Sequence, residues 1–284
     1  MQRIAVIGGG TMGAGIAEVS ARAGCDVVVV EADPSGVERC RGRIESSLAR
    51  ATRSGRLGAD DATAALARIE VATELQAVAG SELVIEAVPE VEQMKLDLFR
   101  SLDAILPPEA ILASNTSSIP LVKMAASVGA RADKVVGVHF FNPAPVLPLV
   151  EIVASLLTSE QTLQSVTDFA EKQLGKTTIR SKDRAGFIVN ALLIPYVLSA
   201  IRMLESGFAS AEDIDAGMVQ GCAHPQGPLA LADLIGLDTT AAVAQSMYEE
   251  FKEPLYAPPP LLLRMVDAGL LGRKTGRGFF PYAR

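Results

Sequence analysis

The sequence is poor in cysteine, in histidine and in positive charge. It has three cysteines and two histidines among 284 residues, and its net charge is −7. Cys25, Cys40 and Cys222 are odd in number and lack the spacing of a metal site, so we expect no metal and no disulfide framework. The negative charge argues against general nucleic-acid binding.

Long apolar runs are also missing. The most apolar late stretch, residues 188–201, contains Asn190 and Pro195 and is too short to span a bilayer. The first expected strand begins by Ile4, which leaves no room for a signal or transit peptide. We therefore expect a reduced, cytoplasmic protein. Hydrophobic residues make up 49% and charged residues 21%, which is globular, and 284 residues favour two domains over one core.

What the sequence does contain is a glycine motif near its start. The apolar runs 4–7 and 27–30 predict two buried strands, with a helix through Ala23 between them. The motif G-x-G-x-x-G lies at Gly8, Gly10, Thr11, Met12 and Gly13. Gly8 permits a tight turn, Gly10 lets a pyrophosphate approach the backbone, and Gly13 lets the helix pack closely on the strand. The phosphates would then lie at the helix N-terminus. The alternative is a tight turn in an unrelated α/β protein, and the strand–turn–helix context favours a dinucleotide site.

Glu31 indicates which dinucleotide binds. It ends the second strand, 18 residues after Gly13. A carboxylate there accepts hydrogen bonds from the adenosine ribose hydroxyls and repels a 2′-phosphate. No Arg or Lys occurs in residues 32–37, so we expect NAD rather than NADP. The alternative is a solvated acid at a strand end.

Strands and helices then alternate up to residue 183. We expect strands at 69–72, 83–88, 110–114, 134–141, 149–153 and 177–180, and helices at 91–105, 121–127 and 160–174. This alternation predicts an α/β fold with a mostly parallel, Rossmann-type sheet covered on both faces. Such sheets bind ligands at the carboxyl ends of their strands, where Glu31, Glu90, Asn115, Ser117 and His139 fall.

Residues 37–57 form a basic island in this acidic chain. Two acids, Glu38 and Glu45, stand against six arginines: Arg39, Arg41, Arg43, Arg50, Arg53 and Arg56. The segment reads as a helical hairpin inserted after the second strand. It is either a platform for a polyanionic ligand, with arginine forks on phosphates, or a solvated helix face, and charge alone does not decide between them.

Beyond residue 183 the pattern predicts helices only. We expect them at 186–205, 211–220, 229–251 with a break at Gly236, and 261–270. We therefore place a dinucleotide-binding domain at 1–183 and an all-α domain at 184–284. About a hundred residues are enough for a separate core and a subunit contact.

His139 is the candidate general base. It ends a strand, and Glu151 follows twelve residues later. A His–carboxylate pair holds the imidazole in one tautomer and stabilises the imidazolium that forms. A lone histidine after a strand is more often structural, but Asn115 and Ser117 at a neighbouring strand end favour a catalytic role. His224, at a helix joint, is interpreted as structural.

Several longer motifs resemble one enzyme family. They are IAVIGGGTMGAGIA, LVIEAVPE, ILASNTSS, VGVHFFNPAPVLPLVEIV, GFIVNALLIPYVLSAI, HPQGPLALADLIGLDT and GRKTGRGFF. The chain resembles, almost end to end, the short-chain L-3-hydroxyacyl-CoA dehydrogenases, most closely the bacterial 3-hydroxybutyryl-CoA dehydrogenases. HFFNP followed by GFIVN is the most specific pair.

The resemblance implies NAD-dependent, reversible oxidation of (S)-3-hydroxyacyl-CoA, as in fatty acid metabolism, and a homodimer formed through the C-terminal domain. It assigns proton removal from the 3-hydroxyl to His139, orientation of His139 to Glu151, a hydrogen bond to the C3 oxygen to Ser117, and contact with the thioester or 3-oxygen to Asn190. It also implies cofactor contacts by the glycine turn, Glu31, Glu90, Lys95 and Asn115. The basic hairpin would face coenzyme A through Ser47, Arg50 and Arg53. The family's lysines after the serine are replaced here by Arg53 and Ser54, so the detailed phosphate contacts differ.

Two other functions stay open. The first is a related NAD enzyme that acts on a free hydroxy acid or sugar acid, which activity without coenzyme A would favour. The second is a non-catalytic NAD-binding protein. The presence of Ser117, His139, Glu151 and Asn190 together argues against a purely structural role.

Overall fold

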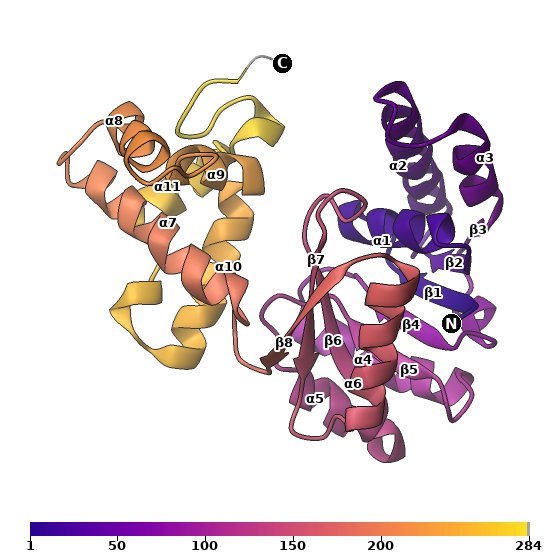
Figure 1. Cartoon of the computed structure of the whole chain (residues 1–284). Coiled ribbons are helices and arrows are strands. Elements are labelled where there is room, and N and C mark those ends of the chain that lie inside the picture. The colour runs from indigo at the N-terminus through magenta and orange to yellow at the C-terminus, as the bar shows by residue number, and fades with distance from the viewer. Residues whose placement is uncertain (283–284) are drawn as a thin grey trace. The chain divides into compact units, whose positions relative to one another are not determined.

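The computed structural model describes residues 1–282. Its chain forms two compact units, Met1–Asp183 and a second that begins at Arg184. The first contains a sheet with helices, and the second contains helices. Figure 1 shows both units coloured along the chain.

One eight-stranded sheet organises the first unit. Its strands are β1 (Arg3–Ile7), β2 (Asp26–Val30), β3 (Ile69–Ala72), β4 (Leu83–Glu86), β5 (Ile111–Ser114), β6 (Val135–Phe140), β7 (Leu149–Ala154) and β8 (Thr177–Lys182). They lie in the order β3-β2-β1-β4-β5-β6-β7-β8 (Figure 1). The six strands β1–β6 are parallel in the Rossmann order, which confirms the predicted fold class. β7 turns back antiparallel to β6, and β8 runs parallel to β7.

Helices cover both faces of this sheet. They are α1 (Thr11–Arg22), α2 (Pro34–Arg53), α3 (Ala59–Ala67), α4 (Glu92–Ile105), α5 (Leu121–Ser127) and α6 (Glu160–Asp168), which continues as a π-helical turn, Phe169–Gln173. Ile4 and Val6 of β1 join one apolar cluster with residues of α1, α2 and α6. Phe99 of α4 and Leu121 of α5 are fully buried outside that cluster. α4 and α5 therefore pack on the opposite face.

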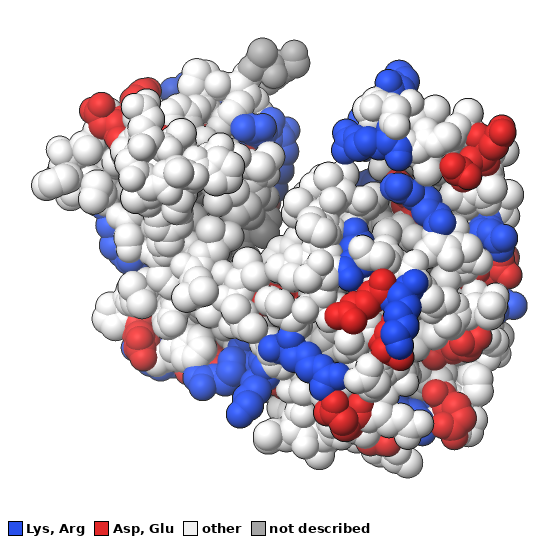
Figure 2. All heavy atoms as spheres, in the orientation of Figure 1, with Lys and Arg blue, Asp and Glu red and all other residues white. Residues whose placement is uncertain are grey.

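The predicted hairpin after β2 is present as α2 and α3. Asp33 caps α2 by accepting a hydrogen bond from Gly36 N, with Pro34 in the first turn. Cys40, Ile44 and Leu48, one turn apart, are its buried stripe. The other positions of α2 are free to carry charge, and Figure 2 shows basic side chains gathered over α2 and acidic ones over α3.

The second unit packs around its own apolar core. Its helices are α7 (Val189–Glu205), α8 (Ala211–Ala216), α9 (Pro228–Ile235), α10 (Leu237–Phe251) and α11 (Pro260–Asp267), and a π-helical turn (Gly217–Gly221) follows α8. Ile201, Leu229, Leu237 and Met247 are fully buried within it. The break predicted at Gly236 is confirmed, because its φ of 103° ends α9 and lets α10 begin in a new direction. The predicted start at residue 186 is wrong: Gly186 and Phe187 have positive φ, and α7 starts at Val189.

Within the described residues 1–282, no helix is both long enough and apolar enough to cross a bilayer. The apolar stretch at 188–201 belongs to α7, whose buried residues Ile194, Val197, Leu198 and Ile201 face the core of the second unit. Packing thereby accounts for these four side chains, whereas Leu192 of the same helix is exposed.

Candidate active site

The glycine motif forms the turn between β1 and α1. Gly8 has a φ of 91°, and a Cβ on Gly13 would lie 1.7 Å from the carbonyl oxygen of Gly8, so only glycine fits at these two positions. A Cβ on Gly10 would meet nothing within 4 Å. Gly10 is the N-cap of α1 and brings no side chain to the first-turn N–H groups, including those of Thr11 and Met12. The turn therefore fits a pyrophosphate, with open space above Gly10 and backbone donors at the positive end of a helix.

Glu31 lies beside this turn, after the last residue of β2. Its Oε1 accepts a hydrogen bond from Gly9 N at 2.8 Å. A Cβ on Gly36 would lie 2.9 Å from the other carboxylate oxygen. The carboxylate is thus held at the edge of the glycine turn, where the adenosine ribose of a dinucleotide lies in this fold.

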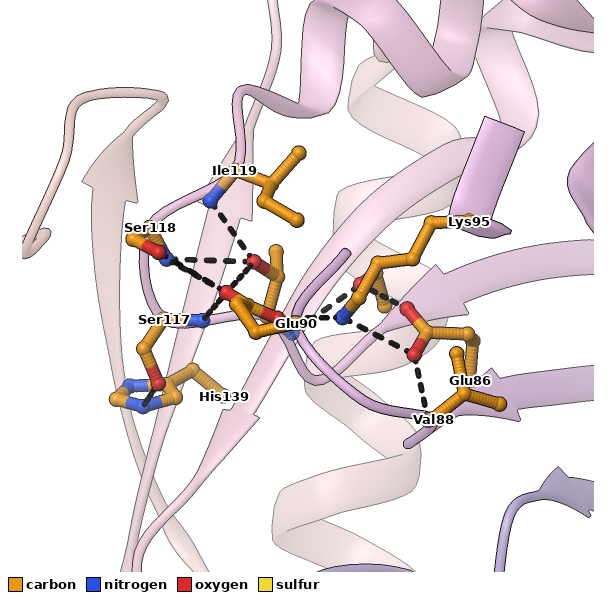
Figure 3. A network of polar contacts seen from close by, with 10 residues as sticks. Glu86, Val88, Glu90, Lys95, Ser117, Ser118, Ile119 and His139 are labelled. Carbon is orange, nitrogen blue, oxygen red and sulfur yellow. Dashed lines mark hydrogen bonds and ion pairs between the residues drawn. The ribbon is translucent and has the colours of Figure 1, made fainter. Parts of the chain in front are cut away.

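A buried ion-pair network occupies the ends of β4 and β5 (Figure 3). Lys95, 1% exposed, places its ammonium 3.0 Å from Glu86 Oε1 and 2.6 Å from Glu90 Oε2. Glu86 is fully buried and also accepts hydrogen bonds from Ser114 Oγ at 2.6 Å and Val88 N at 2.7 Å. One buried cation thus balances two carboxylates, of which Glu86 is buried and Glu90 is 38% exposed.

Burial and charge act differently on the two carboxylates. Burial is the largest influence on Glu86 and raises its pKa, despite the Lys95 charge and the Ser114 hydroxyl. Burial also opposes ionisation of Glu90, but the charge of Lys95 and several hydrogen bonds outweigh it and lower the pKa of Glu90. Glu90 therefore stays ionised as the acceptor of this site.

Glu90 fixes the turn that carries Ser117. Its Oε1 accepts hydrogen bonds from Ser117 N at 3.1 Å, from Ser118 N at 3.2 Å and from the Thr116 hydroxyl. Figure 3 shows these donors converging on Glu90, while the Ser117 side chain points the other way, toward the His139 ring. Asn115, at the start of the turn, accepts a hydrogen bond from Phe140 N at 2.9 Å and ties β5 to β6.

His139 and Glu151 face each other across β6 and β7. The antiparallel register pairs His139 directly with Glu151, and His139 Nδ1 lies 2.7 Å from Glu151 Oε2. His139 is 5% exposed and Glu151 is fully buried. Since a carboxylate only accepts hydrogen bonds, it holds the imidazole proton on Nδ1. The lone pair of Nε2 then faces Ser117 Oγ, 3.1 Å away.

A groove opens between α1, α2 and the loop after β6. It has a volume of about 660 Å³ and reaches from Thr11, the first residue of α1, to Asn142 and Pro143. Ser47 and Arg50 of the basic island line it. Arg53 does not belong to its lining.

Asn190 belongs to the second unit. It is the second residue of α7 and is half-buried. The first unit therefore brings together Ser117, His139 and Glu151 without it.

Part of this site could not be found by motif alone. The sequence pointed to Glu90 and Lys95 but missed Glu86, Ser114, Thr116 and Ser118, which complete the network. One signal was present: Glu86 is an acid inside the apolar run LVIEAV. Buried acids are rare unless they are paired, so an acid at a strand position predicts a partner.

A Rossmann sheet, a glycine turn that fits a pyrophosphate and a buried His–Glu pair at the same edge are together typical of a dinucleotide-dependent dehydrogenase. Comparison with known proteins shows to which family of dehydrogenases the chain belongs. The model of the 3-hydroxyacyl-CoA dehydrogenase NAD binding domain matches residues 3–184, and that of the C-terminal domain matches residues 186–282. The chain belongs to the 3-hydroxyacyl-CoA dehydrogenase family.

Similar proteins span the whole chain. A 3-hydroxybutyryl-CoA dehydrogenase of Mycobacterium tuberculosis is 52% identical over 283 residues, which cover 99% of each chain. The crystal structure of M. tuberculosis FadB2 has a TM-score of 0.98 at 52% identity, covering 100% of this chain and 99% of the other. That of (S)-3-hydroxybutyryl-CoA dehydrogenase PaaH1 from Ralstonia eutropha has a TM-score of 0.93 at 44% identity, covering all of both chains.

Proposed function

We propose that this chain reversibly oxidises (S)-3-hydroxyacyl-CoA thioesters, with 3-hydroxybutyryl-CoA as the preferred substrate, to 3-oxoacyl-CoA, and that the His139–Glu151 pair is its general base. The observation that carries the proposal is a chain of two side-chain contacts through His139. Its Nε2 lies 3.1 Å from Ser117 Oγ, and its Nδ1 lies 2.7 Å from Glu151 Oε2. The names of relatives that match the full length of the chain support the substrate class.

Ser117, His139 and Glu151 each have a separate role. With the proton held on Nδ1 by Glu151, His139 Nε2 removes the proton of the substrate 3-hydroxyl. The buried Glu151 carboxylate balances the positive imidazolium that results. Ser117 Oγ donates a hydrogen bond to the C3 oxygen. Asn190 is proposed to contact the thioester or the 3-oxygen.

The nicotinamide of NAD accepts the hydride from C3 when bound. The glycine turn, with Thr11 and Met12, holds the pyrophosphate, and Glu31 holds the adenosine ribose. Glu90 and Lys95 act mainly by fixing the turn with Ser117, next to Asn115. A 2′-phosphate would meet the Glu31 carboxylate, so we expect NADPH to be a much poorer reductant than NADH.

Coenzyme A is proposed to lie along α2. Ser47 and Arg50 line the groove beside α1 and offer a hydroxyl and a guanidinium to its phosphates. Arg53, one turn further, adds a weaker, more distant charge. This gives the basic island the polyanionic ligand that its composition favours.

The second unit is proposed to form a homodimer. Phe208 is 79% exposed and Leu192 is 74% exposed, an unusual degree of exposure for such large apolar side chains. An almost wholly apolar hollow of about 330 Å³ lies on the same unit, with Met203 and Met218 in its lining.

The three unpaired cysteines are compatible with the reducing cytoplasm, which we propose as the location of this protein.

The experiment that tests the proposed function compares three substrates in one assay. NADH oxidation is followed with acetoacetyl-CoA, with free acetoacetate and with longer 3-oxoacyl-CoA thioesters at equal concentrations. We expect turnover of the thioesters only, with the highest kcat/KM for acetoacetyl-CoA. Equal turnover of free acetoacetate would instead support an enzyme of free hydroxy acids.

A further inference from the structure

Arg43 touches two surfaces that the proposed function gives to different ligands. From the third turn of α2, its Nη1 donates a hydrogen bond to Gly9 O at 3.2 Å, within the glycine turn. The same side chain lines the groove that contains Ser47 and Arg50. Gly9 N, on the other side of that residue, donates to Glu31. Arg43 therefore lies where the dinucleotide turn and the groove meet.

The charge of Arg43 is not neutralised by an acid. Among the described residues, none of the six arginines of the basic island forms an ion pair, although arginines elsewhere in the chain do. Of these six, Arg39, Arg43 and Arg50 line the groove, and Arg43 also bonds to the glycine turn. The hydrogen bond to Gly9 O uses a single N–H of the Arg43 guanidinium, which has five.

Two polyanions are proposed to bind on either side of this position. The pyrophosphate of NAD would lie at the N-terminus of α1, which starts at Thr11, and Thr11 also lines the groove proposed for coenzyme A. The phosphates of two ligands this close repel each other, and the repulsion weakens binding of the second ligand. A cation between them reduces that repulsion.

We propose that Arg43 couples the two ligands, by screening the phosphates of coenzyme A from those of the dinucleotide so that both bind at once. This inference rests on the proposed function, since it needs coenzyme A in the α2 groove. It assigns Arg43 a role different from that of Arg50, which contacts one ligand only. By linkage, the effect on NADH binding equals the effect on coenzyme A binding.

The test is a binding experiment with two ligands that do not react together. The Kd of NADH is measured by its fluorescence, alone and with saturating coenzyme A, at low salt. The wild-type ratio of these two Kd values is expected to lie near one. Arg43→Gln loses the charge but keeps a polar side chain, and we expect it to raise the ratio by about three- to tenfold.

Two further variants test whether the effect depends on the charge at residue 43, on the shape of its side chain or on its position in the helix. Arg43→Lys restores the charge and should return the ratio close to the wild-type value. Arg41→Gln removes the same charge two residues away, outside the groove lining, and should leave the ratio unchanged. High salt should shrink the effect of Arg43→Gln.

The outcomes distinguish this inference from the proposed function. A ratio in Arg43→Gln equal to the wild-type ratio, or an equal rise in Arg41→Gln, overturns the coupling role while the proposed function stands. Failure of the wild-type protein to bind coenzyme A at all overturns the proposed function and, with it, this inference.

Discussion

At the scale of single residues, the strand register creates the candidate base. His139 and Glu151 are twelve residues apart in sequence, and the antiparallel pairing of β6 and β7 places them opposite each other. The sequence predicted both residues and their chemistry from residue type and family motifs. It also predicted that they form a pair, but not the register that brings them to 2.7 Å, because a mostly parallel pattern does not show that β7 reverses direction.

The thiol of Cys40 gives a prediction at the same scale. Cys40 is fully buried, and a Cβ on Gly9 would lie 2.4 Å from its Sγ. Burial, followed by the nearby Glu31 carboxylate, raises its pKa to about 11. Since the thiolate is the reactive form, Cys40 should stay unreactive at pH 8 and react only as the pH approaches 11.

The measurement is thiol modification by a coloured disulfide reagent in the native protein. We expect one fast thiol at pH 8, the exposed Cys222, and loss of that fast phase in Cys222→Ser. Rapid modification of Cys40 at pH 8 would show that the glycine turn opens more readily than its packing indicates.

At the scale of elements, the network around Lys95 joins β4, α4 and the turn after β5. Lys95→Met leaves Glu86 buried without its cation, and we expect it to lower the free energy of unfolding by about 3–5 kcal/mol at pH 7. The pKa of Glu86 is already raised, so protonation relieves the unpaired charge as the pH falls. The loss should therefore be smaller at pH 5 than at pH 7.

Urea unfolding at the two pH values measures this difference. Lys123→Met is the matched control, because it breaks the exposed pair of Lys123 with Glu92 and should cost less than about 1 kcal/mol. A loss for Lys95→Met as small as that of the control, or one that grows toward pH 5, would contradict the network as described.

Helix α2 gives a second prediction at this scale. Arg50 lines the groove and Arg53 does not, so Arg50→Ala should raise the KM for acetoacetyl-CoA by about tenfold at low salt, and Arg53→Ala by no more than about threefold. Steady-state kinetics at low and high salt measure both values. If even the double variant leaves KM unchanged, the basic island is only a solvated helix face.

The elements themselves were largely predictable from sequence. Apolar runs located β1, β2 and β4, and charge with helical spacing located the hairpin of α2 and α3. The start of α7 was missed, because the positive φ of Phe187 is rare for a residue with a side chain and leaves no mark in a hydrophobic pattern. Contacts such as Lys95 with two acids depend on tertiary packing, which spacing along the chain does not encode.

At the scale of the whole molecule, self-association should depend on the exposed apolar surface of the second unit. Phe208→Glu places a charge on a residue that is 79% exposed in the single chain. If this surface is buried in a homodimer, the variant should shift the mass toward that of one chain. Leu66→Glu, on α3 of the first unit, is the control and should leave the mass unchanged.

Light scattering coupled to gel filtration measures these masses. If the wild-type protein, Phe208→Glu and Leu66→Glu are all dimers, Phe208 lies outside the interface. A monomeric wild-type protein at micromolar concentration would remove the proposed dimer altogether.

His139, held by Glu151, is proposed as the general base of this enzyme. The most direct measurement is the kcat of His139→Gln with (S)-3-hydroxybutyryl-CoA and NAD, beside the Kd of NADH for the same protein. We expect a kcat lower by about 10²–10⁴-fold, with NADH binding within about twofold of the wild-type value, since the imidazole removes the proton and the glycine turn holds the dinucleotide. A kcat within about threefold of the wild-type value would contradict it.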